Sequence, residues 1–258
     1  DVIKAAVVVE LTHLATLYHD DVMDEAQLRR GAPSANARWD NAVAILTGDF
    51  LFARASDILA DLGPEAVRIQ AQTFERLCTG QIRESVGPDD GIDPVKHHLQ
   101  VLADKTGSLI ATAGRFGTMM SGADSETIDI MTRFGESIGV ACQLADDIVD
   151  IASDASQSGK APGTDLKEGV PTLTALIART SNDSDDAALI SYLSGPIDND
   201  HDHSSALELL RAHPALEAAR EEARRWASDA RRTLSPLPDS PSRRALEALC
   251  DFVVNRSG

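Results

Sequence analysis

Three copies of the pattern Asp-Asp-x-x-Asp, beginning at Asp20, Asp89 and Asp146, are the groups in this sequence best suited to binding a metal ion. The middle copy lies between Pro88 and Pro94 and contains a glycine, so we expect an exposed loop whose carboxylates share no face. Each of the other two closes an apolar stretch with helical spacing. These two copies are therefore the candidates for chemistry.

Within each candidate copy, the first and last aspartates lie on the same side of a helix. Asp20 pairs in this way with Asp24, and Asp146 with Asp150, because positions i and i+4 are neighbours on a helix surface. Like charges at this spacing destabilise a helix, and the dipole at its C-terminal end adds to the repulsion. We therefore expect two unpaired acidic clusters that bind a hard divalent cation such as Mg²⁺, whose ligands are carboxylate, water and phosphate oxygens.

Side chains near the first copy favour a phosphorylated ligand. Arg29 and Arg30 follow it, and Gly31 turns the chain behind them. Guanidinium groups match the geometry of phosphate oxygens. His13 lies seven residues before Asp20 and hence on the same helical side. The combination predicts a diphosphate bridged to the protein by metal ions.

The elements that must position these groups are predicted to be helices, in an all-α single domain. Aromatic residues make up 4% of the chain, strand-like alternation is almost absent, and apolar residues recur three and four apart. The polar stretch 181–202 predicts a loop. The clearest helical stretches are 2–26, 40–61, 64–86, 94–106, 108–121, 125–153, 171–180, 204–212, 214–234 and 241–256.

Composition excludes several classes of protein. Lys+Arg 24 against Asp+Glu 41 gives a net charge of −17, so we expect neither nucleic acid nor an anionic lipid surface as a partner. No apolar run approaches the roughly 20 residues that span a bilayer, so we expect no transmembrane segment. Cys78, Cys142 and Cys250 lack CxxC spacing, which favours a reducing compartment and predicts a cytoplasmic protein.

The stretch from His13 to Asp24, followed by Arg29-Arg30-Gly31, resembles the first aspartate-rich motif of the trans-isoprenyl diphosphate synthases, the polyprenyl synthetase family. The resemblance covers about residues 5–178 and implies the isoprenoid synthase fold, a bundle of roughly ten or more helices around a central cavity. The other matching motifs follow in the family's order: Thr79-Gly80-Gln81, Lys105-Thr106-Gly107-Ser108-Leu109, Gln143 to Asp150, Lys160, and Gly163 to Gly169.

Two departures from the family pattern are visible. The family's Gly-Gly-Lys-x-x-Arg segment is absent, and the sequence opens at Asp1 inside a helical pattern with no methionine. We therefore expect residues 1–258 to be a polyprenyl synthetase domain whose N-terminal helices lie upstream. In addition, Val170 stands where many relatives carry a lysine for the allylic diphosphate.

The resemblance implies a prenyltransferase that condenses isopentenyl diphosphate with an allylic diphosphate, through metal-assisted ionisation of the allylic substrate. It also implies three Mg²⁺ ions per active site and a homodimer. The two acidic clusters are expected to face each other across the mouth of the cavity. The implied metal ligands are Asp20, Asp24 and Asp146, and the implied orienting residues around them are Asp21, Asp147 and Asp150.

The resemblance likewise assigns the substrate-binding and catalytic residues. Thr106 and Gln143 stabilise the allylic cation, and Gly107 is expected to break its helix and let substrate approach the backbone. Gln81 belongs to the substrate-binding residues. Arg29, Lys105 and Lys160 are implied to hold the allylic diphosphate, with Lys105 counted among the catalytic residues, and Arg30 and His13 to hold isopentenyl diphosphate.

Product length is expected to depend on the first helix. Val8, Thr12 and Ala15 share the helical side below the first acidic cluster, where the growing chain would descend. In the family, a bulky aromatic residue four or five positions before the first aspartate closes the pocket. Thr16 and Ala15 occupy those positions here and are small. We therefore expect a medium- or long-chain all-trans product, on the order of six to ten isoprene units, for a quinone side chain.

Three other functions compete with this interpretation. A class I terpene cyclase also begins with an aspartate-rich motif, but usually carries an Asn/Asp-Ser/Thr-Glu second motif. A non-catalytic subunit of a heteromeric prenyl synthase tends to lose its acidic motifs, and both are kept here. A metal-binding helical scaffold without chemistry is suggested by the acidity alone. His201 and His203 lie in a polar stretch and are not expected to bind metal.

Overall fold

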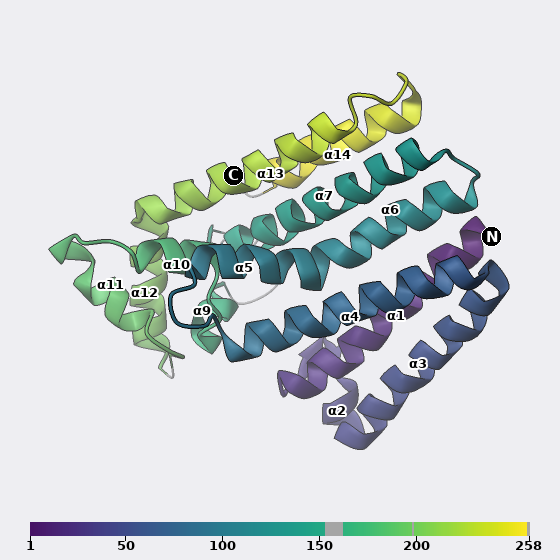
Figure 1. Ribbon diagram of the computed structural model, residues 1–258. Helices are drawn as coiled ribbons and strands as arrows, with labels where there is room; N and C mark the ends of the chain where they lie inside the picture. Colours follow the sequence, from purple (N-terminus) through teal and green to yellow (C-terminus); the bar gives the residue numbers. More distant parts are fainter. Residues whose placement is uncertain (153–161, 198, 257–258) are drawn as a thin grey trace. The chain divides into compact units, whose positions relative to one another are not determined.

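The computed structural model describes residues 1–152, 162–197 and 199–256 (Figure 1). Helices dominate, and the only sheet in these ranges is a hairpin of two-residue strands, β1 (Leu28–Arg29) and β2 (Ala32–Pro33). The all-α class predicted from the sequence is confirmed. The helices are α1 (Val2–Met23), α2 (Ala35–Arg38), α3 (Asn41–Leu62), α4 (Pro64–Val86), α5 (Pro94–Leu102), α6 (Ser108–Met120), α7 (Ser125–Ala152), α9 (Thr164–Glu168), α10 (Leu173–Ala178), α11 (Ala187–Tyr192), α12 (Asp200–Ala212), α13 (Pro214–Thr233) and α14 (Pro241–Asn255), with a π-helical turn η1 (Ala103–Gly107) and a 3-10 turn η2 (Ser184–Asp186).

Most long helices begin and end within a few residues of the predicted bounds, but the loop expected over 181–202 is wrong in part. It contains η2, α11 and the first turn of α12. Asp183 accepts a hydrogen bond from the backbone N–H of Asp185 and so caps η2, and Leu189 of α11 is buried. Local capping and tertiary burial therefore override the polar composition of this stretch.

The chain divides into two compact units. The first comprises Asp1–Glu75 and Ala111–Thr132, and the second comprises Arg76–Ile110 and Arg133–Gly258. The divisions fall within α4, α6 and α7, so these helices contribute residues to both units. The expected central cavity concerns the placement of the two units relative to each other, and it stays a prediction.

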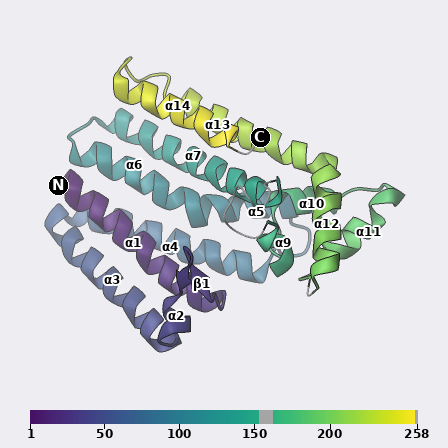
Figure 2. The ribbon, with the colours of Figure 1, turned by 180° about the vertical axis from the view of Figure 1, so that it is seen from behind.

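In the first unit, α1 packs along α3, and α2 lies beside both (Figure 2). Ala5 and Val8 of α1 are buried with Leu59 of α3, Ile69 of α4 and Phe116 of α6. Residues of this buried cluster are three or four positions apart in α1, α3 and α4, as expected of helices with one apolar face. The hairpin β1–β2 follows α1 directly, so the first acidic cluster stands at the junction of helix and hairpin (Figure 2).

In the second unit, α7 supplies the centre of the core. Leu144, Ile148 and Ile151 are almost fully buried and belong to one apolar cluster with Leu173 of α10 and Leu210 of α12. The helices α13 and α14 lie side by side, and α10 contacts α13 (Figure 1). The second acidic cluster thus lies on α7, a helix that is held in place by its buried apolar residues.

Two glycines let η1 and α7 approach closely in the second unit. A Cβ atom on Gly139 would lie 2.8 Å from the Cα of Gly107, and one on Gly107 would lie 3.1 Å from the carbonyl oxygen of Glu136. Gly107 does not break the helix, because η1 continues directly into α6. The expectation of a helix break is therefore wrong; at Gly107 the missing side chain makes room for α7.

One described helix meets the length and composition of a membrane span. It is α1, with 22 residues, and 22% of its most apolar window is buried. Core helices and signal sequences meet the same two criteria, so these properties do not distinguish a membrane span from either. The absence of a transmembrane segment therefore stays a prediction.

Gly139→Ala should destabilise the protein by about 1–3 kcal/mol, because the added methyl group meets backbone atoms that cannot rotate away. Gly117→Ala is the matched control, since Gly117 is also helical and a Cβ there would meet nothing within 4 Å. Ala favours a helix over Gly by up to about 1 kcal/mol, so the control should be neutral or stabilised. Urea unfolding measures both, and equal effects at the two positions would contradict the close crossing.

Candidate functional site

The first acidic cluster lies at the C-terminal end of α1. Asp20 and Asp21 are in its last turn, and Asp24 follows the helix as its C-cap. The backbone N–H of Asp24 donates to the carbonyl of Asp20 at 2.8 Å, so the helical spacing predicted for this pair extends through Asp24. One turn thus carries two carboxylates, whose oxygen atoms are of the kind that a hard cation prefers.

Asp21 has a different environment, because it is buried and paired with Arg29. The Nε of Arg29 donates to Asp21 Oδ1 at 2.7 Å, and its Nη2 lies 2.5 Å from the same oxygen. Positive φ angles at Arg30 and Gly31 turn the hairpin and bring Arg29 back towards α1. The expectation that the cluster is unpaired is therefore wrong, and Arg30 is exposed next to the turn.

The predicted product-length residues line a buried side of α1. Val8, Thr12 and Ala15 are fully buried, and Thr16 is half-buried. The hydroxyl of Thr12 accepts a hydrogen bond from Gln70 of α4 at 2.7 Å, so this side of α1 contacts α4 within the first unit. Their role in product length stays a prediction. His13 is half-buried on the same helix, where its carbonyl accepts a hydrogen bond from Thr16.

In the second unit, Lys105 and Thr106 stand on the π-helical turn η1. π-helical turns of this kind are rare and occur frequently at functional sites. The turn is held by Asp104, which is 4% exposed and accepts hydrogen bonds from Arg76 Nε at 2.9 Å, Arg83 Nη1 at 2.7 Å and Gln100 Nε2 at 3.0 Å. A buried carboxylate with three donors is fully stabilised, so it fixes the neighbouring Lys105 and Thr106.

Lys105 has a carboxylate partner of its own. Its Nζ donates to Glu84 Oε2 of α4 at 2.5 Å. The two helices are close there because a Cβ on Gly80 would lie 2.9 Å from the backbone nitrogen of Lys105. Gln81, next to that glycine, is half-buried, and its Oε1 has no hydrogen-bond partner among the described residues. The motifs around Gly80 and Lys105, distant in sequence, are thus adjacent in the second unit.

The two residues expected to stabilise a cation are brought together. The Thr106 hydroxyl donates to Gln143 Oε1 at 3.3 Å, and Gln143 Nε2 donates to Asp147 Oδ1 at 3.0 Å. The side-chain amide of Gln143 is therefore oriented by Asp147, and the Thr106 hydroxyl by Gln143. This chain joins the Lys-Thr motif to the second acidic cluster.

The three aspartates of the second cluster have three environments. The side chain of Asp146 is 58% exposed and lies 2.8 Å from Arg256 Nη2, whereas Asp147 is buried. Asp150 accepts hydrogen bonds from the backbone N–H groups of Thr164 and Asp165 and thus caps α9. The expectation of an unpaired cluster is therefore wrong for this cluster too.

Burial shifts the proton affinity of two groups beside this chain. It raises the pKa of Asp147 to about 8, opposed by the hydrogen bond from Gln143 and assisted by the neighbouring carboxylates Asp165, Asp146 and Asp150. On α5, burial lowers the pKa of His98 to about 4, with a smaller contribution from His97. The Nε2 of His98 lies 3.9 Å from Asp147 Oδ2.

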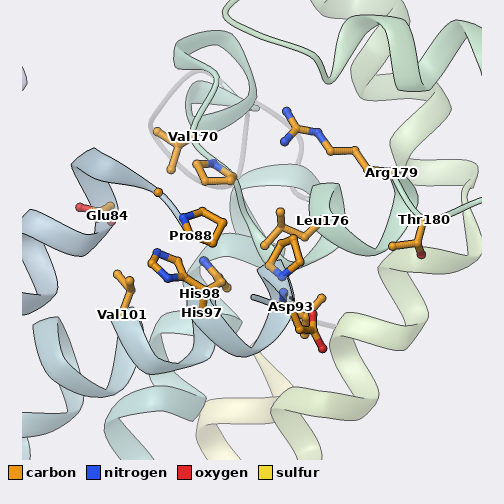
Figure 3. Close-up of a pocket in the computed structure, with 14 residues that line it drawn as sticks. Glu84, Pro88, Asp93, His97, His98, Val101, Val170, Leu176, Arg179 and Thr180 are labelled. Atoms are coloured by element: carbon orange, nitrogen blue, oxygen red, sulfur yellow. Dashed lines mark hydrogen bonds between the residues drawn. The ribbon is translucent and has the colours of Figure 1, made fainter. Parts of the chain in front are cut away.

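A pocket of about 420 Å³ lies beside His98 in the second unit (Figure 3). Its wall is largely apolar and includes Val101 of α5 and Leu176 of α10, with Glu84 and Arg179 among its polar residues. A volume of this size suits a small organic molecule. Because Glu84 is the partner of Lys105, the pocket adjoins the groups described above.

Some predicted features lie beyond what the structure describes. Lys160 is outside the described residues. Within the described ranges, no group of three or more His, Cys, Asp or Glu side chains is arranged to hold a metal ion. The first acidic cluster belongs to the first unit and the second cluster to the second unit. The expectation that the two clusters face each other therefore stays a prediction.

Sequence reasoning missed the supporting residues of this site, and most left no signal. Asp104 directly precedes the Lys-Thr motif, and Glu84 lies three residues after Gln81, so adjacency to a motif was the available signal for these two. Arg76, Arg83, His98 and Arg256 carry no such signal, because their partners are 21 to 110 residues away in sequence.

Comparison with known proteins places this arrangement among relatives. The Polyprenyl synthetase family matches residues 1–210. A nonaprenyl diphosphate synthase of Mycobacterium tuberculosis is 54% identical over 254 residues, covering 98% of this chain and 76% of that protein. A geranylgeranyl pyrophosphate synthase structure from Corynebacterium glutamicum, complexed with calcium and isoprenyl diphosphate, has a TM-score of 0.89 at 49% identity, covering 99% of this chain and 78% of the other. A decaprenyl diphosphate synthase structure from Rhodobacter capsulatus has a TM-score of 0.89 at 33% identity, covering 99% and 79%.

Asp147→Asn should weaken the pH dependence of stability between pH 6.5 and 8. In this range the folded protein keeps a proton on Asp147 that the unfolded chain has lost, so raising the pH lowers the free energy of unfolding of the wild type. Asn cannot ionise and removes this contribution. Urea unfolding across this range in magnesium-free buffer measures the slope, with Asp89→Asn, the same substitution at an exposed position, as the control. Equal slopes for wild type and Asp147→Asn would contradict the raised pKa.

Proposed function

Because this chain belongs to the polyprenyl synthetase family, we propose that it condenses isopentenyl diphosphate with an allylic diphosphate and releases a longer all-trans prenyl diphosphate. The observation that carries this proposal is the hydrogen-bonded chain from Thr106 through Gln143 to Asp147. It joins a polar group suited to an allylic cation to an acidic cluster suited to cations, which would take up the charge of the departing diphosphate.

The carboxylates fit magnesium as the metal. Asp20 and Asp24 in the first unit, and Asp146 in the second, offer hard oxygen donors with few protein ligands per cluster. Mg²⁺ commonly takes one or two carboxylates and completes its shell with water and substrate phosphate. Two proposed ligands in the first cluster and one in the second therefore suit it. We propose three bound ions, which would supply positive charge to the leaving diphosphate. A solved relative is complexed with calcium and isoprenyl diphosphate.

Basic residues of each unit are proposed to bind the diphosphates. Lys105 offers a charged amine on the rigid turn η1, and Glu84 holds that amine in place. Arg29 is positioned by Asp21 in the same way and supplies a planar donor pair for phosphate oxygens. These two residues, with Lys160, are proposed for the allylic diphosphate, and His13 and Arg30, with Gln81 as a further substrate-binding residue, for isopentenyl diphosphate.

The geometry of Thr106 suits a cationic intermediate. Its hydroxyl hydrogen points to Gln143 Oε1, which leaves the oxygen lone pairs available to a positive charge. The bond between the allylic carbon and the diphosphate oxygen breaks, and the double bond of isopentenyl diphosphate supplies the electrons of the new carbon–carbon bond. The released diphosphate then accepts the proton lost from the adduct, so the chain's own groups need only bind and orient.

We propose a product on the order of six to ten isoprene units, destined for a quinone side chain. The small residues at Ala15 and Thr16 support it, because neither position carries the bulky ring that would close this side of α1. Relatives with similar identity carry names with different product lengths, nonaprenyl at 54% and geranylgeranyl at 49%. Identity alone therefore does not set the length, and we propose that the side chains beside α1 do.

We further propose that the protein is a cytoplasmic homodimer. The three cysteines are free: Cys78 is exposed, Cys142 is half-buried and Cys250 is buried. Free thiols at these three positions are compatible with a reducing compartment. The net charge of −17 supports the absence of nucleic acid among its partners.

Asp20→Asn combined with Asp24→Asn should lower kcat at least a hundredfold, because the carboxylates proposed to hold magnesium lose their charge. The matched control is Asp89→Asn combined with Asp90→Asn, which makes the same charge change in the loop between α4 and α5. The assay supplies isopentenyl diphosphate, Mg²⁺ and farnesyl or geranylgeranyl diphosphate, and identifies products by mass.

Three outcomes of that assay would contradict the proposal. Equal losses in both double variants would mean that net charge, and not the first cluster, is what matters. A cyclised hydrocarbon from the wild type would indicate a terpene cyclase. No turnover by the full-length wild type would indicate a non-catalytic subunit or a scaffold.

Ala15→Phe and Thr16→Phe should each shorten the longest product by several isoprene units, because a ring on this side of α1 fills space that the growing chain needs. Thr16 is half-buried and tolerates the ring better than fully buried Ala15, so Thr16→Phe guards against loss of folding. Mass spectrometry of the products is the measurement. An unchanged product distribution in folded, active Thr16→Phe would contradict the tunnel assignment.

A further inference from the structure

His98 on α5 faces the second acidic cluster from outside the predicted motifs. Its side chain is 10% exposed, and its Nε2 lies 3.9 Å from Oδ2 of Asp147, whose side chain is also 10% exposed. One side of the residue lines the 420 Å³ pocket, where Figure 3 shows it next to His97. Both groups belong to the second unit, so their distance is set within one compact body.

The Nε2 atom of His98 is buried and has no hydrogen-bond partner among the described residues. Leaving such a group unsatisfied costs about 1–3 kcal/mol, so buried imidazoles almost always find a partner. Asp147 Oδ2 at 3.9 Å is beyond hydrogen-bond distance, but an approach of about 1 Å would make a normal bond. Such a bond can form whichever of the two atoms carries the proton.

Asp147 is already engaged through its other oxygen. Oδ1 accepts the hydrogen bond from Gln143 Nε2 at 3.0 Å, and the amide oxygen of Gln143 accepts the bond from the Thr106 hydroxyl. A carboxylate bound at one oxygen only can rotate about its Cβ–Cγ bond, whereas a second bond at Oδ2 fixes the plane of the group. That plane determines where the Gln143 amide points, and thereby the direction of the Thr106 hydroxyl.

The neighbouring histidine has no such connection and serves as a comparison. His97 lies on the same helix and lines the same pocket, but its Nε2 bonds with the backbone carbonyl of Arg83 at 3.1 Å. It is half-buried rather than buried. The two adjacent imidazoles thus differ in burial and in the group that each faces.

We infer that His98 is a positioning residue for prenyl transfer, acting through Asp147 and Gln143 on the orientation of the Thr106 hydroxyl. The effect on prenyl transfer rests on the proposed function, whereas the link from His98 to Thr106 rests on the distances given above. His98 touches neither substrate in this account. It determines how precisely the cation-stabilising groups are held when the diphosphate leaves.

The first test separates a hydrogen-bonding role from mere filling of space. His98→Leu should lower kcat about tenfold, the lower end of what loss of a supporting hydrogen-bond partner does to activity, with KM for both diphosphates within twofold. His98→Gln places an amide N–H close to the position of Nε2 and should recover kcat to within threefold. Equal losses in Leu and Gln variants of matched thermal stability would overturn the inference, as would a loss confined to KM.

The control variants are His97→Leu and His97→Gln, which should leave kcat within twofold. A kcat loss in the His97 variants equal to that at His98 would overturn the inference, because it would show a general effect of altering the pocket wall. A double-variant cycle with Gln143→Met tests the route. If His98 acts through Gln143, the double variant should lose much less than the product of the two single losses, and additive losses would overturn the route.

A spectroscopic test works even without turnover and so separates this inference from the proposed function. In protein labelled with ¹⁵N-histidine, His98→Gln identifies the His98 ring signals by their disappearance. Asp147→Leu should then shift the Nε2 signal of His98 and leave that of His97 unmoved. An unmoved His98 signal would overturn the inference, whereas an inactive wild type with the expected shift would overturn only the proposed function.

Discussion

The buried carboxylate of Asp104 is the interaction on which the second unit's chemistry depends. A charge this deep is stable only with partners, and it has Arg76, Arg83 and Gln100, which come from α4 and α5. Without these partners the buried charge would be uncompensated, which costs several kcal/mol in typical proteins. The structure therefore holds the ends of two helices together at η1. Lys105 and Thr106 are held in place because Asp104, which precedes them in sequence, is fixed by its hydrogen bonds.

The helices and the family were predictable from the sequence, while the pairing of charges was not. Apolar spacing marks α3, α4 and α7 because one side of each helix is buried over many turns. The family expected from five ordered motifs is confirmed. Short elements such as α9 and α11 escape this logic, since a helix of five or six residues depends on contacts made by distant segments.

The acidic clusters show why a motif predicts chemistry better than it predicts environment. Three aspartates of one motif have three different environments here. Asp146 is exposed beside an arginine, Asp147 is buried against an amide, and Asp150 caps a helix. The partners lie far along the chain, or across a hairpin in the case of Arg29 and Asp21. A one-dimensional pattern carries no information about such pairs. It therefore suggested unpaired clusters where the fold supplies counter-charges.

The ion pair between Arg256 and Asp146 makes the C-terminal end of α14 a competitor for the second cluster. Any cation that takes both oxygens of Asp146 must first displace a guanidinium tethered at 2.8 Å, which reaches the carboxylate without diffusing to it. An exposed pair of this kind is worth about 0–1 kcal/mol, or up to about fivefold in apparent affinity. Metal binding at Asp146 is thereby coupled to the position of the last helix. Removing the last few residues, Arg256 included, would lower the metal concentration needed to occupy this carboxylate.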